Sequence, residues 1–250
     1  MPFFRYQGSD VFYTEDGAGA PCIFLHGNTA SSRMFEPILP LYTSHMRAIR
    51  MDFLGNGRSE RVSAFPDELW IDQGHQVVTL CEALDCGKVD LIGTSGGAYA
   101  AINAALERPD LFHRVVADSF DGSTLPTGFG KGILRERRKA KRDELARGFY
   151  AWCQGEDWET VVDLDTQALV NYERKGLRLF RRPIEDIQVP LLITVSRQDE
   201  MLSNDMETEC RRLREQNPNI RSRIYDTGGH PLILTRADEL AGEIIPFLRG

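Results

Sequence analysis

The stretch Val89-Asp90-Leu91-Ile92-Gly93-Thr94-Ser95-Gly96-Gly97 decides how this chain is interpreted. Its first residues predict a short buried strand, and the alanine-rich run at residues 98–106 predicts a helix directly after the turn. A serine on a tight turn from strand to helix has a strained backbone, and a glycine two residues away on each side leaves space for it. This setting predicts a nucleophilic serine at Ser95. The alternative is a glycine-rich turn with an idle serine.

Strand and helix patterns alternate on either side of this turn. Short apolar or alternating runs predict strands at residues 10–14, 22–25, 47–51, 88–92, 113–117, 191–195 and 220–225. Periodic apolar positions predict helices at residues 66–84, 98–106, 204–216 and 237–248. Ser31 is expected to cap one more helix, which Pro37 and Pro40 shorten or kink. The alternation predicts parallel strands, right-handed crossovers and helices on both faces of one sheet.

The alternation is interrupted once. About 70 residues separate the strand at 113–117 from the strand at 191–195, far more than a crossover needs. Helical patterns at residues 133–152 and 164–180 occupy this interval. We therefore predict a helical lid at residues 122–186, over a core formed by residues 1–121 and 187–250.

A serine hydroxyl is a weak nucleophile without a nearby base, and the sequence offers five histidines. His230 and His26 each follow a predicted strand, which places them at the carboxyl end of the sheet beside Ser95. We expect His230 to be the base and His26 to have a structural role. The other three begin a strand or lie within a helix: His45, His75 and His113.

The base in turn needs a carboxylate to orient it. Asp199 follows the strand at 191–195 by four residues and so lies on the same edge of the sheet. Asp199 is our candidate. Asp118, Asp121 and Asp226 also follow strands and remain rivals.

Taken together, these motifs resemble those of the α/β-hydrolase superfamily over almost the whole chain. The family's order of nucleophile, acid and histidine is matched by Ser95, Asp199 and His230. Its His-Gly motif is matched by His26-Gly27-Asn28, and its D-x-x-G-x-G-x-S loop by residues 52–59. The resemblance implies a mostly parallel eight-stranded sheet with helices on both faces and a small helical lid after the sixth strand. It also implies an oxyanion hole made by the backbone N–H groups of Asn28 and Gly96.

The resemblance implies a serine hydrolase that cleaves a small carboxylic ester through an acyl-enzyme, without a cofactor or a metal. Haloalkane dehalogenases and epoxide hydrolases of this fold use an aspartate nucleophile, and Ser95 therefore disfavours both. Thioesterase or carbon–carbon bond hydrolase activity on the same triad remains open, as does a slow-turnover ligand receptor. The pocket between sheet and lid is expected to be lined by Phe53, Phe120, Phe129 and Trp152.

Composition limits the other classes of function. The 250 residues are 42% hydrophobic and 27% charged, as in ordinary globular proteins. The net charge of −7 argues against nucleic-acid binding. No apolar run reaches about 18 residues, and the first residues show no secretory signal, so we expect no membrane span. Five cysteines without a CxxC pair are interpreted as reduced thiols of a cytoplasmic protein that acts on a small molecule.

One stretch of the predicted lid is strongly charged. Residues 131–147 hold eight basic and three acidic side chains. On a single helix over residues 133–152, Arg138 and Lys141 would interrupt the apolar stripe, which makes them candidates for binding an anionic substrate. The alternative, which we favour, is a solvated helix face.

Overall fold

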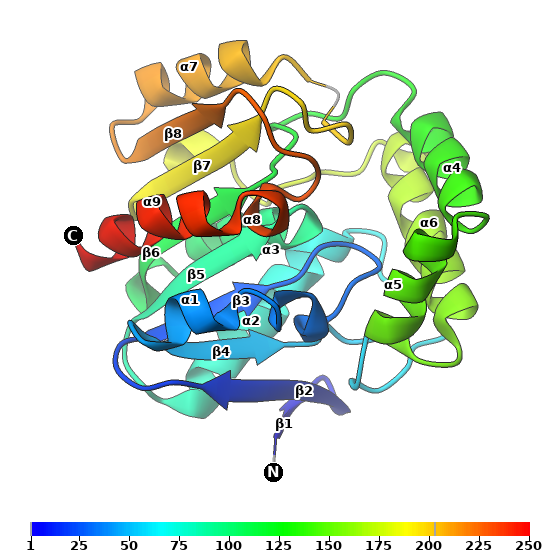
Figure 1. Ribbon diagram of the computed structural model, residues 1–250, viewed down its shortest axis with the longest axis horizontal. Helices are drawn as coiled ribbons and strands as arrows, with labels where there is room; N and C mark the ends of the chain where they lie inside the picture. Colours follow the sequence, from blue (N-terminus) through cyan, green and yellow to red (C-terminus); the bar gives the residue numbers. More distant parts are fainter. Residues whose placement is uncertain (1, 203) are drawn as a thin grey trace.

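The computed structural model describes residues 2–202 and 204–250, and one eight-stranded sheet runs through the centre of this part of the chain (Figure 1). The strand order is β1-β2-β4-β3-β5-β6-β7-β8. The pairs β1–β2 and β2–β4 are antiparallel, and all the other pairs are parallel. The strands are β1 (Phe3–Tyr6), β2 (Ser9–Asp16), β3 (Pro21–Leu25), β4 (Arg47–Met51), β5 (Val89–Thr94), β6 (Phe112–Asp118), β7 (Leu191–Ser196) and β8 (Ile220–Tyr225).

Helices connect the strands and cover both faces of the sheet (Figure 1). The α-helices are α1 (Leu39–Thr43), α2 (Leu69–Leu84), α3 (Gly96–Glu107), α4 (Phe129–Ala140), α5 (Glu144–Gln154), α6 (Trp158–Lys175), α7 (Met206–Gln216), α8 (Leu232–Thr235) and α9 (Ala237–Arg249). Short 3-10 turns lie at η1 (Ser32–Phe35), η2 (Pro109–Leu111) and η3 (Ile184–Asp186).

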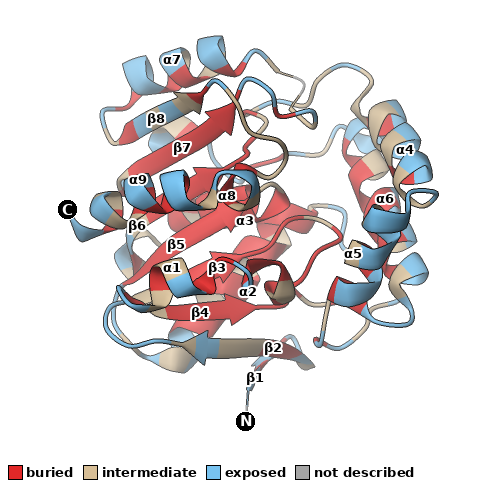
Figure 2. Cartoon of the chain, viewed as in Figure 1, coloured by how far each residue is buried: buried red, intermediate tan, exposed pale blue. Residues whose placement is uncertain are grey.

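The core consists of two apolar layers separated by the sheet. Alternate residues of one strand point to opposite faces, so Ile23 and Leu25 belong to the layer that includes residues of α2, α3 and α7, while Cys22 and Phe24 belong to the layer that includes residues of α1, α8 and α9. The central strands are buried and the helices expose only their outer sides (Figure 2). The predicted class, a mostly parallel α/β sheet with helices on both faces, is confirmed.

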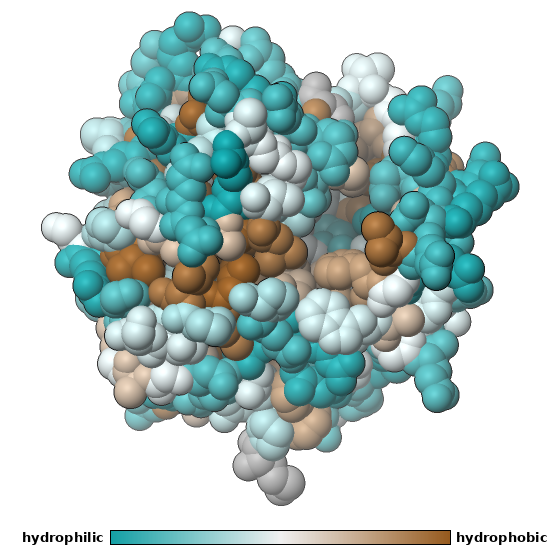
Figure 3. All heavy atoms as spheres, viewed as in Figure 1, coloured by the Kyte–Doolittle hydropathy of each residue, from teal (hydrophilic) through white to brown (hydrophobic). Residues whose placement is uncertain are grey.

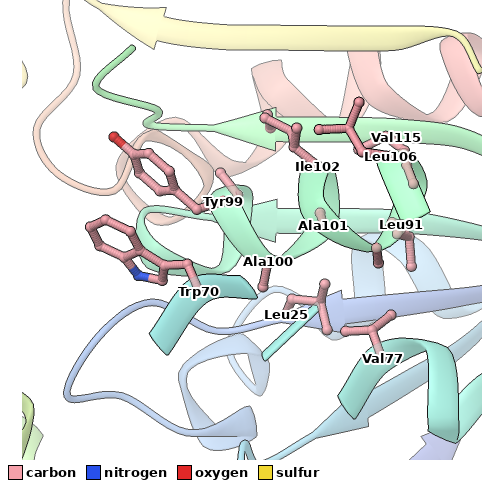
Figure 4. Close-up of a cluster of buried hydrophobic side chains, with 14 of the residues drawn as sticks. Leu25, Trp70, Val77, Leu91, Tyr99, Ala100, Ala101, Ile102, Leu106 and Val115 are labelled. Carbon is pink, nitrogen blue, oxygen red and sulfur yellow. The ribbon is translucent and has the colours of Figure 1, made fainter. Parts of the chain in front are cut away.

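A glycine inside α2 has a packing reason. A Cβ at Gly74 would lie 2.8 Å from the Cβ of Asn103 and 3.0 Å from the backbone nitrogen of Ala104, both on α3. The alanines of α3 permit the same close approach, as the cluster around Ala100 and Ala101 shows (Figure 4). The small residues therefore set how near these two helices lie, and α3 carries Ser95 at its start.

The inserted segment differs from its prediction in one important respect. A single helix over residues 133–152 is wrong, because α4 ends at Ala140 and α5 begins at Glu144. The carboxylate of Asp143 accepts a hydrogen bond from the backbone N–H of Ala146 at 2.9 Å, which caps a new helix. The expected apolar stripe is therefore split, and Leu145 is 85% exposed.

Two smaller predictions near the amino terminus also need correction. The strand β1 was not predicted, although its apolar residues Phe4 and Tyr6 face the core in an alternating pattern. The helix expected after Ser31 is a 3-10 turn followed by the five-residue α1, and the Ser31 side chain makes no capping bond. Proline at positions 37 and 40 explains the interruption, because proline lacks the N–H that a continuous helix needs.

The helices α4, α5 and α6 lie beyond the carboxyl ends of the parallel strands (Figure 1). They form the segment between β6 and β7, where the lid is predicted. Among the described residues, no helix is long and apolar enough to cross a bilayer. All five cysteines are free thiols.

Candidate active site

Ser95 occupies the turn from β5 to α3 with a strained backbone. Its φ of 54° and ψ of −123° lie in a region of backbone angles that residues other than glycine rarely adopt. A Cβ at Gly93 would collide with the carbonyl oxygen of Gly97, and a Cβ at Gly97 would collide with the carbonyl oxygen of Leu25. Glycine is therefore required at both positions for the chain to turn here and to hold the hydroxyl at the end of the sheet.

The structure brings Ser95, His230 and Asp199 into one line of hydrogen bonds. The His230 Nε2 atom lies 2.9 Å from Ser95 Oγ, and Nδ1 lies 3.0 Å from each carboxylate oxygen of Asp199. The Asp199 side chain is fully buried, and that of His230 is 16% exposed. This geometry allows a proton to pass from the serine hydroxyl to an imidazole that a carboxylate orients.

The rival aspartates have other partners. Asp118 accepts hydrogen bonds from the hydroxyls of Thr94 and Thr194 at 2.7 and 2.9 Å, and burial raises its pKa to about 6. Asp226 forms an ion pair with Arg197, and Asp121 accepts a bond from the backbone N–H of Asn204 at 3.0 Å. The imidazole of His230 bonds instead to Asp199.

Glu200 was not selected from the sequence but lies next to the same histidine. Its carboxylate accepts a hydrogen bond from the backbone N–H of His230 at 3.3 Å. Glu200 therefore contacts the main chain of this residue, whereas Asp199 contacts its ring. The two adjacent acids can be distinguished by that difference.

Asn28 and Gly96, the expected oxyanion residues, contact each other beside Ser95. A Cβ at Gly96 would collide with the side-chain oxygen of Asn28, which accepts a hydrogen bond from Trp70 Nε1 at 3.1 Å. Within the part of the chain that the structure describes, neither the Asn28 nor the Gly96 backbone N–H donates to a protein acceptor. Both groups are therefore available to a ligand at the serine.

His26 and the loop at residues 52–59 have structural contacts. His26 Nε2 accepts a hydrogen bond from the backbone N–H of Phe53 at 3.0 Å, and burial lowers the histidine pKa, which keeps the ring neutral. Asp52 accepts backbone bonds from Ser32 at 2.7 Å and Arg58 at 2.8 Å. These bonds join the segment that follows β3 to the loop that follows β4.

Two cavities meet at Ser95. The smaller has a volume of about 80 Å³ and the larger about 650 Å³. In the space-filling view, apolar atoms border a hollow between the inserted helices and the rest of the molecule (Figure 3). Residues that border both cavities are Asn28, Ser95, Arg137, Met201 and His230.

Of the four aromatic residues expected to line the pocket, Phe129 borders the smaller cavity. The prediction is wrong for Phe53 and Phe120, which are fully buried in the hydrophobic core and offer no surface to a ligand. It is also wrong for Trp152, which is 37% exposed and borders neither cavity. Phe120 packs between the rings of Tyr99 and Phe180, which explains its burial.

The charged stretch places a different basic residue at the site than the two expected. Arg138 is exposed, and Lys141 pairs with Asp163 at 2.6 Å, so neither reaches a cavity beside Ser95. Arg137 is buried and borders both cavities. A single helix over residues 133–152 predicts the wrong inward face for α4, because the chain turns between Ala140 and Glu144.

Arg137 belongs to a buried polar network that joins the inserted helices to the core. Its guanidinium donates to Asp165 of α6 at 3.5 Å and to the hydroxyl of Tyr150 of α5 at 3.2 Å. Asp165 also accepts a hydrogen bond from the side-chain amide of Asn28 at 2.6 Å. All three inserted helices are therefore tied to the loop that carries Asn28.

Replacing Asp165 with alanine is expected to lower the free energy of unfolding by about 3 kcal/mol, because Arg137 would lose its buried acidic partner, keeping the half-buried Glu136 at 3.0 Å, and the Asn28 amide would lose its acceptor. Urea unfolding, with midpoint and slope fitted together, measures the change. The double variant Arg137→Met/Asp165→Leu removes both charges and should recover at least about 1 kcal/mol of that loss. A double variant that is less stable than Asp165→Ala would contradict this account.

Among the described residues, no cluster of three or more histidine, cysteine, aspartate or glutamate side chains could hold a metal ion.

The fold and the arrangement at Ser95 agree with a comparison to known families. The model of the alpha/beta hydrolase family matches residues 22–243. The chain therefore belongs to the alpha/beta hydrolase family and is a hydrolase.

The individual relatives share a low sequence identity with this chain or match only part of it. The carboxylesterase YbfK of Bacillus subtilis is 22% identical over 241 residues, which cover 91% of this chain and 80% of that protein. The 2-(acetamidomethylene)succinate hydrolase of Mesorhizobium japonicum is 32% identical over 106 residues, but these cover only 42% of this chain and 37% of that protein. Among solved structures, the esterase EaEST of Exiguobacterium antarcticum superposes with a TM-score of 0.78 at 17% identity, covering 99% of both chains.

Proposed function

We propose that this hydrolase cleaves a small carboxylic ester through an acyl-enzyme formed on Ser95. The observation that carries the proposal is the line of hydrogen bonds from Ser95 Oγ through His230 to Asp199, at the junction of two cavities. Similarity to a carboxylesterase over 91% of the chain supports an ester as the substrate.

In the first half of the reaction, Ser95 Oγ attacks the ester carbonyl carbon while His230 Nε2 accepts the hydroxyl proton. The carbonyl π electrons move to oxygen, and the resulting anion accepts hydrogen bonds from the N–H groups of Asn28 and Gly96. Each such donor typically contributes about 3 kcal/mol to transition-state stabilisation. Asp199 stabilises the imidazolium that forms.

The tetrahedral intermediate then collapses. The carbonyl re-forms, the bond to the alcohol oxygen breaks, and His230 donates its proton to that oxygen. In the second half, His230 removes a proton from water, the hydroxide attacks the acyl-enzyme, and the proton returns to Ser95 Oγ as the acid leaves. The charge on the Asp199 carboxylate is the same at the start and at the end.

Residues 122–186 serve as a lid in this proposal, over a core of residues 1–121 and 187–250. The inserted helices supply walls to both cavities, with Ile133 of α4 in the smaller one and Leu145 of α5 in the larger. A covering of this kind excludes bulk water and so strengthens the electrostatic interactions at the reacting atoms. The proposal further places a small-molecule substrate in the cytoplasm, without a cofactor.

Measuring kcat/KM on matched substrates tests the ester assignment. The panel contains p-nitrophenyl acetate, the corresponding thioester and a vinylogous diketone, together with a fluorophosphonate that labels reactive serines. We expect the oxygen ester to exceed each of the other two by at least about tenfold, a difference of about 1.4 kcal/mol in activation free energy. Faster cleavage of the thioester or the diketone would favour those reactions, and rapid labelling without turnover would favour a receptor.

A further inference from the structure

The two cavities at Ser95 differ strongly in size. The smaller cavity, at about 80 Å³, has about one eighth of the volume of the larger one, at about 650 Å³. The larger cavity, at about 650 Å³, can hold a drug-sized group. A substrate whose reacting carbon lies at Ser95 therefore has little room on one side and much on the other.

Packed aromatic rings hold the wall of the smaller cavity in place. Trp70 stacks on Tyr99 with ring centroids 4.2 Å apart, and both residues border the cavity (Figure 4). Tyr172 stacks on the other side of Trp70 at 4.6 Å, and Phe180 stacks on Tyr99 at 5.5 Å. Closely packed side chains resist displacement, so widening this cavity for a longer group would cost free energy.

The positions of the proton donor and of the oxyanion donors indicate which part of the substrate each cavity receives. Gly96 borders only the smaller cavity, whereas Asn28 and His230 border both, so the carbonyl oxygen lies toward the smaller cavity and the acyl chain takes the side that the alcohol does not. Pro231 and Leu234, which follow His230, border only the larger cavity. The alcohol oxygen must receive its proton from His230, so the alcohol leaves on that side.

We infer that the smaller cavity binds the acyl group and the larger cavity binds the alcohol. The substrate class is then esters of a short-chain acid, such as acetate, with a bulky alcohol. This inference rests on the proposed ester hydrolysis and adds the division of the substrate between the two cavities.

Leu169 and Leu234 provide a matched pair of variants. Leu169 of α6 borders only the smaller cavity, and Leu234 of α8 borders only the larger one. Each change to alanine removes three carbon atoms, the same number that separates valerate from acetate. The measurement is the ratio of kcat/KM for p-nitrophenyl acetate to that for p-nitrophenyl valerate.

We expect the unchanged enzyme to prefer acetate at least tenfold. Leu169→Ala should reduce that preference at least tenfold, whereas Leu234→Ala should leave it within twofold. If Leu169→Ala does not fold, Ile133→Ala tests the same wall, because Ile133 borders the smaller cavity from a half-buried position. On the alcohol side, phenyl acetate and 2-naphthyl acetate should have kcat/KM values within about threefold of each other.

Three results would overturn the inference. Equal use of acetate and valerate by the unchanged enzyme would show that the smaller cavity does not hold the acyl chain. A change of acyl preference in Leu234→Ala but not in Leu169→Ala or Ile133→Ala would reverse the two cavities. Failure to hydrolyse any ester would contradict the proposed function itself, and the assignment of the cavities would fail with it.

Discussion

Ser95→Ala is expected to lower kcat for p-nitrophenyl acetate by about 10⁵-fold while the fold is retained, because alanine has no hydroxyl with which to form the acyl-enzyme. Residual turnover from binding and the oxyanion donors alone should remain about 10³- to 10⁴-fold above the rate in water. Steady-state kinetics with the purified variant measures the loss of kcat, and near-ultraviolet circular dichroism checks that the fold is retained.

Ser119→Ala is the matched control for this experiment. Ser119 borders the same small cavity, but its hydroxyl accepts a hydrogen bond from the backbone N–H of Leu232 at 2.8 Å. Its removal should lower kcat less than tenfold. A folded Ser95→Ala enzyme that retains more than about one hundredth of the activity, or an equal loss in Ser119→Ala, would rule out Ser95 as the nucleophile.

Asp199→Asn is expected to have the second largest effect, a loss of about 10³- to 10⁴-fold in kcat with little change in KM. The carboxylate accepts the Nδ1–H of His230, which leaves Nε2 free to take the serine proton. An amide can donate to Nδ1 instead and so favour the wrong tautomer. Steady-state kinetics near neutral pH is sufficient to measure the loss.

The neighbouring acid and a rival aspartate are the controls. Glu200→Gln keeps a hydrogen-bond acceptor for the His230 backbone N–H and should lower kcat less than tenfold. Asp121→Asn should also have a mild effect. If Asp121→Asn abolishes turnover while Asp199→Asn is mild, the orienting acid follows β6 rather than β7.

The fold class could be predicted because its signals are local. The short apolar strands and the alternation with helices follow from periodicity within a few residues, and the ends of β8 and the start of α9 match the prediction. The break between α4 and α5 was missed because both halves are periodic. A single capping bond from Asp143 decides where the chain turns.

Ser95, Asp199 and His230 could be selected from the sequence because each follows a strand, and parallel strands end at one edge of a sheet. The residues that shape the cavities could not be selected in that way. Phe53 and Phe120 are buried in the core, and Trp152 is exposed on α5, so these three aromatic residues do not line the cavities. Arg137 rather than Arg138 faces inward, since packing against Asp165 and Tyr150 decides which side of α4 is buried.

The α/β class, the tight turn at Ser95 and the order of the three hydrogen-bonded residues can all be predicted from the residues alone. Backbone sterics and strand periodicity act over a few neighbours, so they can be read from spacing alone. The network from Asn28 to Arg137 and the unequal sizes of the two cavities arise instead from how distant parts of the chain pack together. The bond that joins this network to the core links Asn28 and Asp165, which are 137 positions apart, and no local pattern records such a contact.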